Sequence, residues 1–386
     1  MPNLVLQMSQ IELQKPVGAR APRKGTVRPM TDADVPAVAR LFLKIFRGVD
    51  KPASPDLQDY LRTITRGSPS SSEAMRTHIY EQQDGTIRSA LFAVPMRFVA
   101  CGNVVLGRLL GVFMTDANKE AAGVAELVLS LRPRGANFAF CDSASPTSCN
   151  HLLAIGGNLL PVQNLEWSRS FRPMGALVGR LAERILHRRD PGLAALARPV
   201  DTLLRRLVAG KDVQETAGAR VTEMSVPAFL KHAPRLIAHY AVRPLWSEDE
   251  LSWLVSLAAQ NTRLGAFTIR AVEDQAGAVI GCFVYYAAPG RTAHVLNILS
   301  LPGQEITVLD AMFRHLDRAG HLEARGRAQP ALMQGLSLQH WLVFRNKAFA
   351  LALTRSPDVN DAVTRGDVYI GGLAGEDWSR LMYDFH

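Results

Sequence analysis

One strand-to-helix junction constrains the fold of this chain more than any other feature of its sequence. Residues 109–131 read LLGVFMTDANKEAAGVAELVLSL, in which apolar side chains alternate from Leu110 to Met114 and recur at helical spacing from Val124 to Leu131. Alternation with a period of two is typical of a strand, and spacings of three and four residues are typical of an amphipathic helix. The sequence therefore predicts a strand that leads through a short polar loop into a helix.

The predicted helix begins with small residues. Ala121, Ala122 and Gly123 leave its first turn almost without side chains. The first backbone N–H groups of a helix have no partner within the helix, and the helix dipole adds to their attraction for anions. We therefore expect a pyrophosphate group to bind at this helix start.

The segment EAAGVA, Glu120 to Ala125, resembles the pyrophosphate loop of the GNAT acyltransferase superfamily, written Arg or Gln, two residues, Gly, one residue, then Gly or Ala. The Gly and Ala positions match, whereas Glu120 stands where the family usually carries Arg or Gln. A carboxylate beside a phosphate is repulsive, and Lys119 is placed to compensate for it. The resemblance implies that acyl-CoA binds through Lys119, Glu120, Ala121, Ala122, Gly123, Val124 and Ala125.

The order of the elements around this loop also resembles the family, over roughly residues 26–171. We expect a first strand and a first amphipathic helix over 27–46, and then an antiparallel pair over 89–100 and 104–114 that turns at Gly102-Asn103. A fifth strand over 136–145 follows, and then a further helix over 146–161 that ends near Gly156-Gly157.

A similar order of elements begins again after residue 214. The patterns predict a strand over 220–226, two helices over 227–240 and 247–258, and three strands over 265–274, 278–289 and 291–301. A helix over 304–319, the segment LEARGRA over 322–328 and a short helix over 331–338 follow. Two strands, over 347–354 and 367–372, complete the order. The fold class is therefore α/β in the broad sense (α+β), with two tandem GNAT-like domains, each a mixed and mostly antiparallel sheet flanked by helices.

These patterns divide the chain into four parts. Residues 1–24 form a flexible tail, and residues 25–172 form an N-terminal GNAT-like domain that binds acyl-CoA. Residues 173–213 form a basic helical linker, and residues 214–386 form a degenerate C-terminal GNAT-like domain. The C-terminal domain carries larger residues after Gly303 where the first domain has its phosphate loop. We therefore expect the chemistry in the N-terminal domain. The arginines of the linker alternate with leucines, which favours a solvated connector over the alternative of a helix lying on a membrane surface.

The composition excludes several classes of protein. The chain has 386 residues, of which 47% are hydrophobic, and a formal net charge of +9. It has no run of about eighteen apolar residues and no basic start followed by an apolar signal core, so we expect a cytoplasmic protein. Its four cysteines form no CxxC pair, which predicts reduced thiols and no metal site. Aromatic residues are not interleaved with the arginines, so nucleic acid is not an expected partner.

Acyl transfer requires donors for the oxyanion, a base for the acceptor and a proton source for the leaving thiolate. In the resembled family the strand before the loop offers main-chain N–H groups, which here belong to Val112, Phe113 and Met114. Asp142 and His151 are the candidate catalytic residues. As an alternative to catalysis, Asp142 would cap the turn that follows it, and His151 would be a surface or packing residue. The tyrosine that many family members carry as general acid is replaced by leucine.

The predicted function is that of an acyl-CoA-dependent acyltransferase, an N-acetyltransferase that uses acetyl-CoA and no metal. It passes the acyl group to an amine or hydroxyl of a small molecule. Two alternatives stay open: a non-catalytic GNAT-fold binding or scaffold protein, and a Fem-type transferase that takes an aminoacyl group from transfer RNA.

Overall fold

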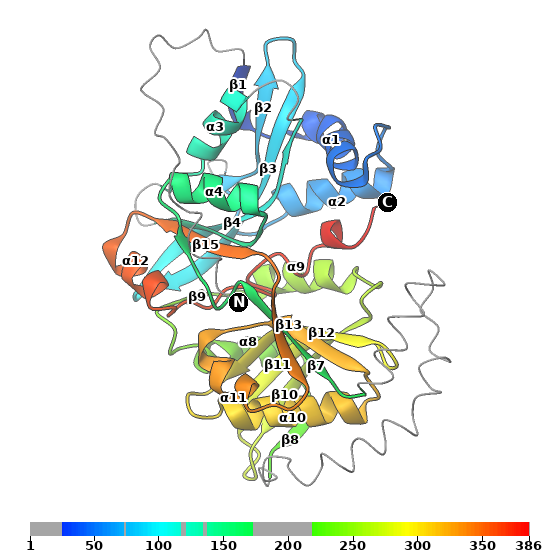
Figure 1. Ribbon diagram of the computed structural model, residues 1–386, viewed down its shortest axis with the longest axis vertical. Helices are drawn as coiled ribbons and strands as arrows, with labels where there is room; N and C mark the ends of the chain where they lie inside the picture. The colour runs from blue at the N-terminus through cyan, green and yellow to red at the C-terminus, as the bar shows by residue number, and fades with distance from the viewer. Residues whose placement is uncertain (1–24, 73–74, 117–120, 134–136, 173–217, 386) are drawn as a thin grey trace, which may run out of the picture.

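The computed structural model describes two β-sheets, one above the other along the long axis of the molecule, with helices on their faces (Figure 1). No helix in this described part of the chain is long and apolar enough to span a membrane. The predicted tail and the predicted basic linker lie outside the part of the chain that the structure describes. The described ranges are 25–72, 75–116, 121–133, 137–172 and 218–385.

The first sheet has the order β1-β2-β3-β4-β5-β15-β6, and β9 pairs with β3 at one end. All its neighbours are antiparallel except β4 and β5, which run parallel. The strands are β1 (Gly25–Pro29), β2 (His78–Gln82), β3 (Ile87–Ala100), β4 (Asn103–Thr115), β5 (Phe138–Ala144), β15 (Phe349–Thr354), β6 (Asn158–Leu159) and β9 (Val242–Pro244). The helices around it are α1 (Val35–Arg47), α2 (Pro55–Arg66), α3 (Ala121–Leu129), α4 (Pro146–Ala154) and α12 (Pro357–Thr364).

The second sheet has the order β14-β7-β13-β12-β11-β10-β8, and its parallel pair is β12 and β13. The strands are β14 (Leu342–Asn346), β7 (Leu165–Ser170), β13 (Glu323–Arg327), β12 (Thr292–Ser300), β11 (Val279–Ala287), β10 (Ala266–Glu273) and β8 (Arg220–Glu223). Its helices are α8 (Val226–Leu236), α9 (Glu248–Ala259), α10 (Glu305–Arg318) and α11 (Met333–Ser337). The prediction of two mixed, mostly antiparallel sheets flanked by helices is confirmed.

Each half of the chain contributes to both sheets: β7 and β15 change places, and β9 of the second half also joins the first sheet. β15 comes late in the chain, yet it pairs with β5 in the first sheet, and β7 comes early but pairs with β13 in the second. Both exchanged strands occupy the same place in their sheets, beside the second member of the parallel pair. The predicted domains 25–172 and 214–386 therefore do not separate the two sheets, because each contributes a strand to the other.

One hydrophobic core joins the two sheets. Successive residues of a strand point to opposite faces, and on β4 Leu109 packs in one core with Leu41 of α1, whereas Leu110 packs in another with Leu127 of α3. Helices α1 and α3 thus cover opposite faces of the first sheet. The core on the α1 face also contains Leu254 of α9 in the second half of the chain.

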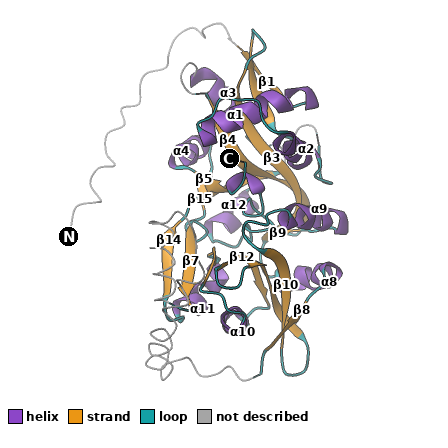
Figure 2. Ribbon diagram, turned by 90° about the vertical axis from the view of Figure 1, so that its right-hand side faces the viewer, coloured by secondary structure: helices purple, strands orange, loops and turns teal. Residues whose placement is uncertain are grey.

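The C-terminal segment, residues 368–385, runs between the sheets and ends beside α1 and α2 (Figures 1 and 2). It fills the place where β12 and β13 diverge. Asn297 of β12 donates from Nδ2 to the Gly371 carbonyl at 3.2 Å and accepts from the Leu373 N–H at 2.8 Å, while Gln329 donates to the Ile370 carbonyl at 2.6 Å. Only about 10 Å³ of cavity is left there.

Two local predictions about the chain path are wrong. The β3–β4 hairpin turns at Cys101-Gly102, one residue earlier than expected, since Ala100 pairs with Asn103 and both turn residues have positive φ angles of 48° and 85°. Residues 367–372 are not a strand. They make two isolated bridges, between Val368 and Val242 and between Gly371 and Ala374, because the segment is used to fill the gap of the second sheet.

We predict that Gly372→Ala destabilises the protein by about 3 kcal/mol, since Gly372 has a φ of +60° and a side chain there would collide with the Leu296 carbonyl. Gly303→Ala is the matched control, because Gly303 has a similar φ of +79° with nothing within 4 Å of an added Cβ, and we expect it to lose about 1 kcal/mol. Urea denaturation compares the two. Equal losses would show that the segment does not pack tightly against β12.

Candidate functional site

The parallel strands β4 and β5 separate along their length. They pair only where Gly107–Leu109 meets Phe138–Phe140, although both strands continue beyond this point. β4 also contains a bulge, because Gly111 and Val112 together lie opposite the single residue Phe92 of β3. A bulge leaves a backbone group outside the ladder and bends the strand. The consequence is a gap between the two strands at their C-terminal ends.

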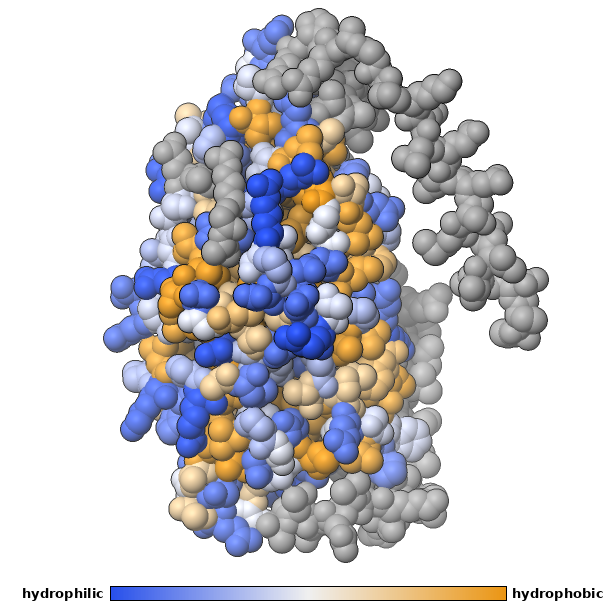
Figure 3. All heavy atoms as spheres, turned by 90° about the vertical axis from the view of Figure 1, so that its left-hand side faces the viewer, coloured by the Kyte–Doolittle hydropathy of each residue, from blue (hydrophilic) through white to orange (hydrophobic). Residues whose placement is uncertain are grey.

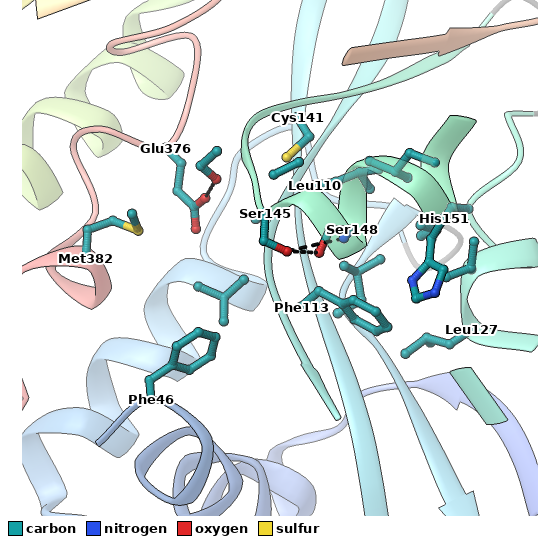
Figure 4. A pocket seen from close by; sticks show the side chains of 18 residues that line it. Phe46, Leu110, Phe113, Leu127, Cys141, Ser145, Ser148, His151, Glu376 and Met382 are labelled. Carbon is teal, nitrogen blue, oxygen red and sulfur yellow. Dashed lines mark hydrogen bonds between the residues drawn. The ribbon is translucent and has the colours of Figure 1, made fainter. Parts of the chain in front are cut away.

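A cavity of about 170 Å³ occupies this gap and is lined from both faces of the sheet. Leu127 of α3 and His151 of α4 line it on one face, and Phe46 of α1 and Met382 of the C-terminal segment line it on the other. Figure 4 shows Glu376 and Met382 entering on the side opposite His151. The cavity thus passes through the sheet and could bring two different molecules together at its centre.

Glu376 places a carboxylate at that centre. It accepts hydrogen bonds from the hydroxyl of Ser143 on β5 and from the backbone N–H of Val112 at the bulge. A Cβ on Gly111 would lie 2.8 Å from Oε1 of Glu376, so glycine at this position allows the carboxylate to approach the strand. The residue is 6% exposed and spans the gap from one strand to the other.

Burial raises the pKa of Glu376 from its ordinary value of 4.5 to about 7. The neighbouring carboxylates Asp142 and Asp377 contribute to this rise in the pKa, while the hydrogen bonds from Ser143 and Val112 act in the opposite direction. A carboxyl group with a pKa near neutrality can both accept and release a proton at physiological pH. Glu376 is therefore suited to act as a general base.

A buried ion cluster holds the loop that carries Glu376. Arg327 of β13 is 5% exposed, and its guanidinium lies 3.7 Å from Oδ2 of Asp142 and 3.6 Å from Oδ2 of Asp377. Lys347 also contacts Asp377, at 2.6 Å. Burial opposes the ionisation of Asp377, but Lys347 and Arg327 hold its pKa below the usual range. The cluster fixes Asp377, and with it the adjacent Glu376.

Of the predicted catalytic residues, only His151 lines the cavity. Its ring meets Phe113 edge-on at 6.3 Å between centroids, and its Nδ1 is buried with no hydrogen-bond partner. Asp142 is fully buried behind the cavity, where it accepts the Glu376 backbone N–H at 3.2 Å. Burial raises its pKa despite the nearby Arg327. This position favours a role in holding Glu376 over direct contact with a substrate.

The predicted cofactor residues lie on the bulged strand and on α3. Val112 and Phe113 line the cavity, whereas Met114 is buried in the core on the α1 face. α3 begins at Ala121, as predicted for the helix start, and its first turn contains Ala122, Gly123 and Val124, followed by Ala125. Lys119 and Glu120 lie outside the described residues.

Gly123 also has a packing reason to be glycine. It is buried against the ring of Tyr80 on β2, and a Cβ at this position would collide with that ring. The absence of a side chain therefore brings α3 close to the sheet. Since this contact concerns the Cα of Gly123 and not the backbone N–H groups of the helix start, it leaves the expected pyrophosphate site untested.

Glu376 and Ser143 were not predicted from the sequence. Ser143 is the residue after Asp142, and Glu376 follows the glycine-rich run GGLAG. The glycines are a partial signal: a side chain at Gly375 would collide with Asp142. Such a run indicates a close approach of backbone to another element but does not say which element.

The thiols near the site are inert. Cys141 lines the cavity, but burial raises its pKa to about 12, and the carboxylates of Glu376 and Asp142 add to the effect. The described residues contain no group of side chains that could hold a metal ion. The four cysteines are free, and three of them are buried, as predicted.

Comparison with solved structures identifies the fold. A conserved protein of unknown function from Enterococcus faecalis V583, described as a probable N-acyltransferase, superimposes with a TM-score of 0.54 at 9% identity over 86% of this chain and 72% of its own. A GCN5-related N-acetyltransferase from Anabaena variabilis ATCC 29413 gives 0.54 at 8% identity over 85% and 72%. No family model and no curated protein sequence matches the chain. The predicted resemblance to the GNAT superfamily is confirmed at the level of the fold.

We predict that Glu376 makes the stability of the protein fall as the pH rises from about 4.5 to about 7. In this window the folded protein holds a proton that the unfolded chain releases, so the free energy of unfolding decreases by about 3 kcal/mol and is constant above it. Glu376→Gln keeps the size of the side chain without the titration. Urea denaturation of both proteins between pH 4 and pH 9 checks this, and parallel curves would contradict the assignment.

Proposed function

We propose that this protein is an acyltransferase that takes an acyl group from coenzyme A, acetyl in the first instance, and transfers it to an amine or hydroxyl of a small-molecule acceptor. One observation carries the proposal: the carboxylate of Glu376, with a pKa of about 7, lies in the gap between the diverging strands of a GNAT fold. The gap opens toward α3 and α4 on one face and toward α1 on the other.

Coenzyme A would lie on the α3 face. Its pyrophosphate would take the unpaired N–H groups at the start of α3, over residues 121–124, where the helix dipole favours an anion. The pantetheine arm would then follow the apolar wall formed by Leu127, Leu131 and Phe113 into the gap. This path ends at the bulge of β4, where the thioester carbonyl would meet the N–H of Val112.

The acceptor would enter from the α1 face. Phe46 and Met382 border the cavity there and are each 43% exposed, which favours an acceptor with an apolar part next to its nucleophile. The acceptor nitrogen or oxygen attacks the thioester carbon, and Glu376 takes its proton. The carbon–sulfur bond then breaks, and the thiolate leaves with a proton. His151 lies on the coenzyme face of the cavity and is the proposed donor of that proton.

We predict that Glu376→Gln lowers kcat by about 100-fold to 10,000-fold, because an amide cannot accept the proton of the acceptor. The affinity for acetyl-CoA stays within a fewfold of the wild type. In the wild-type protein kcat/KM rises with pH through about 7, where the carboxyl group of the free protein loses its proton, and the variant loses this dependence.

Calorimetry with acetyl-CoA and with desulfo-CoA, together with turnover on a panel of amines, measures these effects. An active Glu376→Gln variant with an unchanged pH profile would remove Glu376 from the mechanism. Binding of coenzyme A to the wild-type protein without turnover on any acceptor would instead support a non-catalytic binding protein.

We predict that Ala125→Glu weakens acetyl-CoA binding by about tenfold, because it places a negative charge beside the proposed pyrophosphate site at an exposed position of α3. Leu129→Glu is the matched control: Leu129 is 49% exposed on the same helix, one turn further from its start. We expect little change there. Equal effects of the two variants in calorimetry would show that the helix start does not hold the pyrophosphate.

A further inference from the structure

A second cavity, of about 420 Å³, lies beside the C-terminal end of α3. Its described lining comes from β1, from the start of β2 and the residues before it, from the start of β4 and of β5, and from the residues that follow α3. Leu131 lines both this cavity and the one between β4 and β5, so the two are neighbours under the same helix. We call it the Arg108 cavity, after the arginine of β4 that lines it.

Arg108 is a buried cation without a described counter-ion. It is only 4% exposed, and no carboxylate lies within ion-pair distance of its guanidinium among the described residues. Its Nη2 donates to the Arg76 carbonyl at 2.7 Å and lies 2.6 Å from Nδ1 of His78, which is itself 2.7 Å from the same carbonyl. Its Nε is buried with no hydrogen-bond partner at all.

The residues around Arg108 do not neutralise it. None of the described side chains that line the cavity is acidic. Burial and the charge of Arg108 lower the pKa of His78 to about 4, so the imidazole is neutral at physiological pH. The C-terminal end of α3 brings a partial negative charge of about half an elementary unit, which compensates the guanidinium only in part.

A purely structural role does not account for this charge. The two described groups within hydrogen-bond distance of Arg108 are neutral, whereas an isolated ion in a protein interior costs several kcal/mol unless it is paired. The cavity beside it has the size of a small-molecule site. A guanidinium that lines such a cavity, with no carboxylate paired to it among the described residues, carries planar N–H donors that suit a carboxylate or phosphate group.

We propose that the Arg108 cavity binds a small molecule through a carboxylate or phosphate group, for which Arg108 supplies the counter-charge. His78, Ser130 and Asn137 offer neutral polar contacts around it, and Arg132 adds an exposed positive charge at the rim. Hydrophobic and hydrophilic residues are interspersed on the face of the molecule that carries α3 and α4 (Figure 3). The site is separate from the proposed pyrophosphate site, which lies at the opposite end of α3.

The test uses inorganic phosphate and succinate as probes, each titrated by calorimetry into the full chain at pH 7. We expect the wild-type protein to bind at least one of them, and the preferred probe distinguishes a phosphate from a carboxylate ligand. Arg108→Met should weaken this binding at least tenfold, and Arg108→Lys, which keeps the charge without the planar fork, should weaken it less. Arg88→Met is the control for loss of an arginine elsewhere on the first sheet, since Arg88 pairs with Asp116.

Two outcomes would overturn the proposal: no binding of either probe to the wild-type protein, or equal binding to wild type and Arg108→Met. If Arg108→Met does not fold, Arg108→Lys and the wild type decide the question. Ala125→Glu separates this site from the coenzyme site. Phosphate binding that Ala125→Glu abolishes and Arg108→Met preserves would belong to the start of α3, and would refute the Arg108 cavity while supporting the proposed acyltransferase.

Discussion

The guanidinium of Arg327 is the interaction on which the arrangement of the site depends. It is buried on β13 of the second sheet, yet it faces Asp142 of the first sheet and Asp377 of the C-terminal segment. It also donates to the Gln163 carbonyl at 2.7 Å, in the connection that leads from β6 to β7. A buried charge must be paired to be tolerated, so the two sheets and the segment are held together at one point. Glu376 lies beside that point.

The two halves of the chain have related geometries and different uses. In each sheet the parallel pair diverges next to a bulge, at Gly111 and Val112 on β4 and at Leu296 on β12. The C-terminal segment fills the second gap with backbone and hydrogen bonds to Asn297, and it then reaches the first gap with a single carboxylate. The second sheet therefore supports the site from behind, and the cavity that described residues line in its own gap has only about 10 Å³. The expectation that chemistry belongs to the N-terminal half stays a prediction, and the proposed base Glu376 comes from the C-terminal half of the chain.

The sequence predicted local structure well and long-range pairing poorly. The junction between β4 and α3 follows from apolar periodicity, because that pattern reports which side of an element is buried. The exchange of β7 and β15 does not follow from it, since each strand has a pattern that suits either sheet. Glu376 was missed for the same reason: it belongs to a loop, and its importance comes from the strands to which the fold brings it. Asp142 was found because it ends a strand beside the gap, but its burial is a property of the packing across two sheets.

The backbone N–H of Val112 links the two proposed roles of the site. This N–H donates to Glu376, and it is also the group that a thioester carbonyl would need at the bulge of β4. One N–H cannot serve a carboxylate and a developing oxyanion equally, so binding of acyl-CoA would displace Glu376 from Val112. The displaced carboxylate would lose a stabilising hydrogen bond and become a stronger base, and Asp142 would still hold the Glu376 backbone. In the proposed mechanism, acyl-CoA therefore binds first and activates the base for the acceptor that follows.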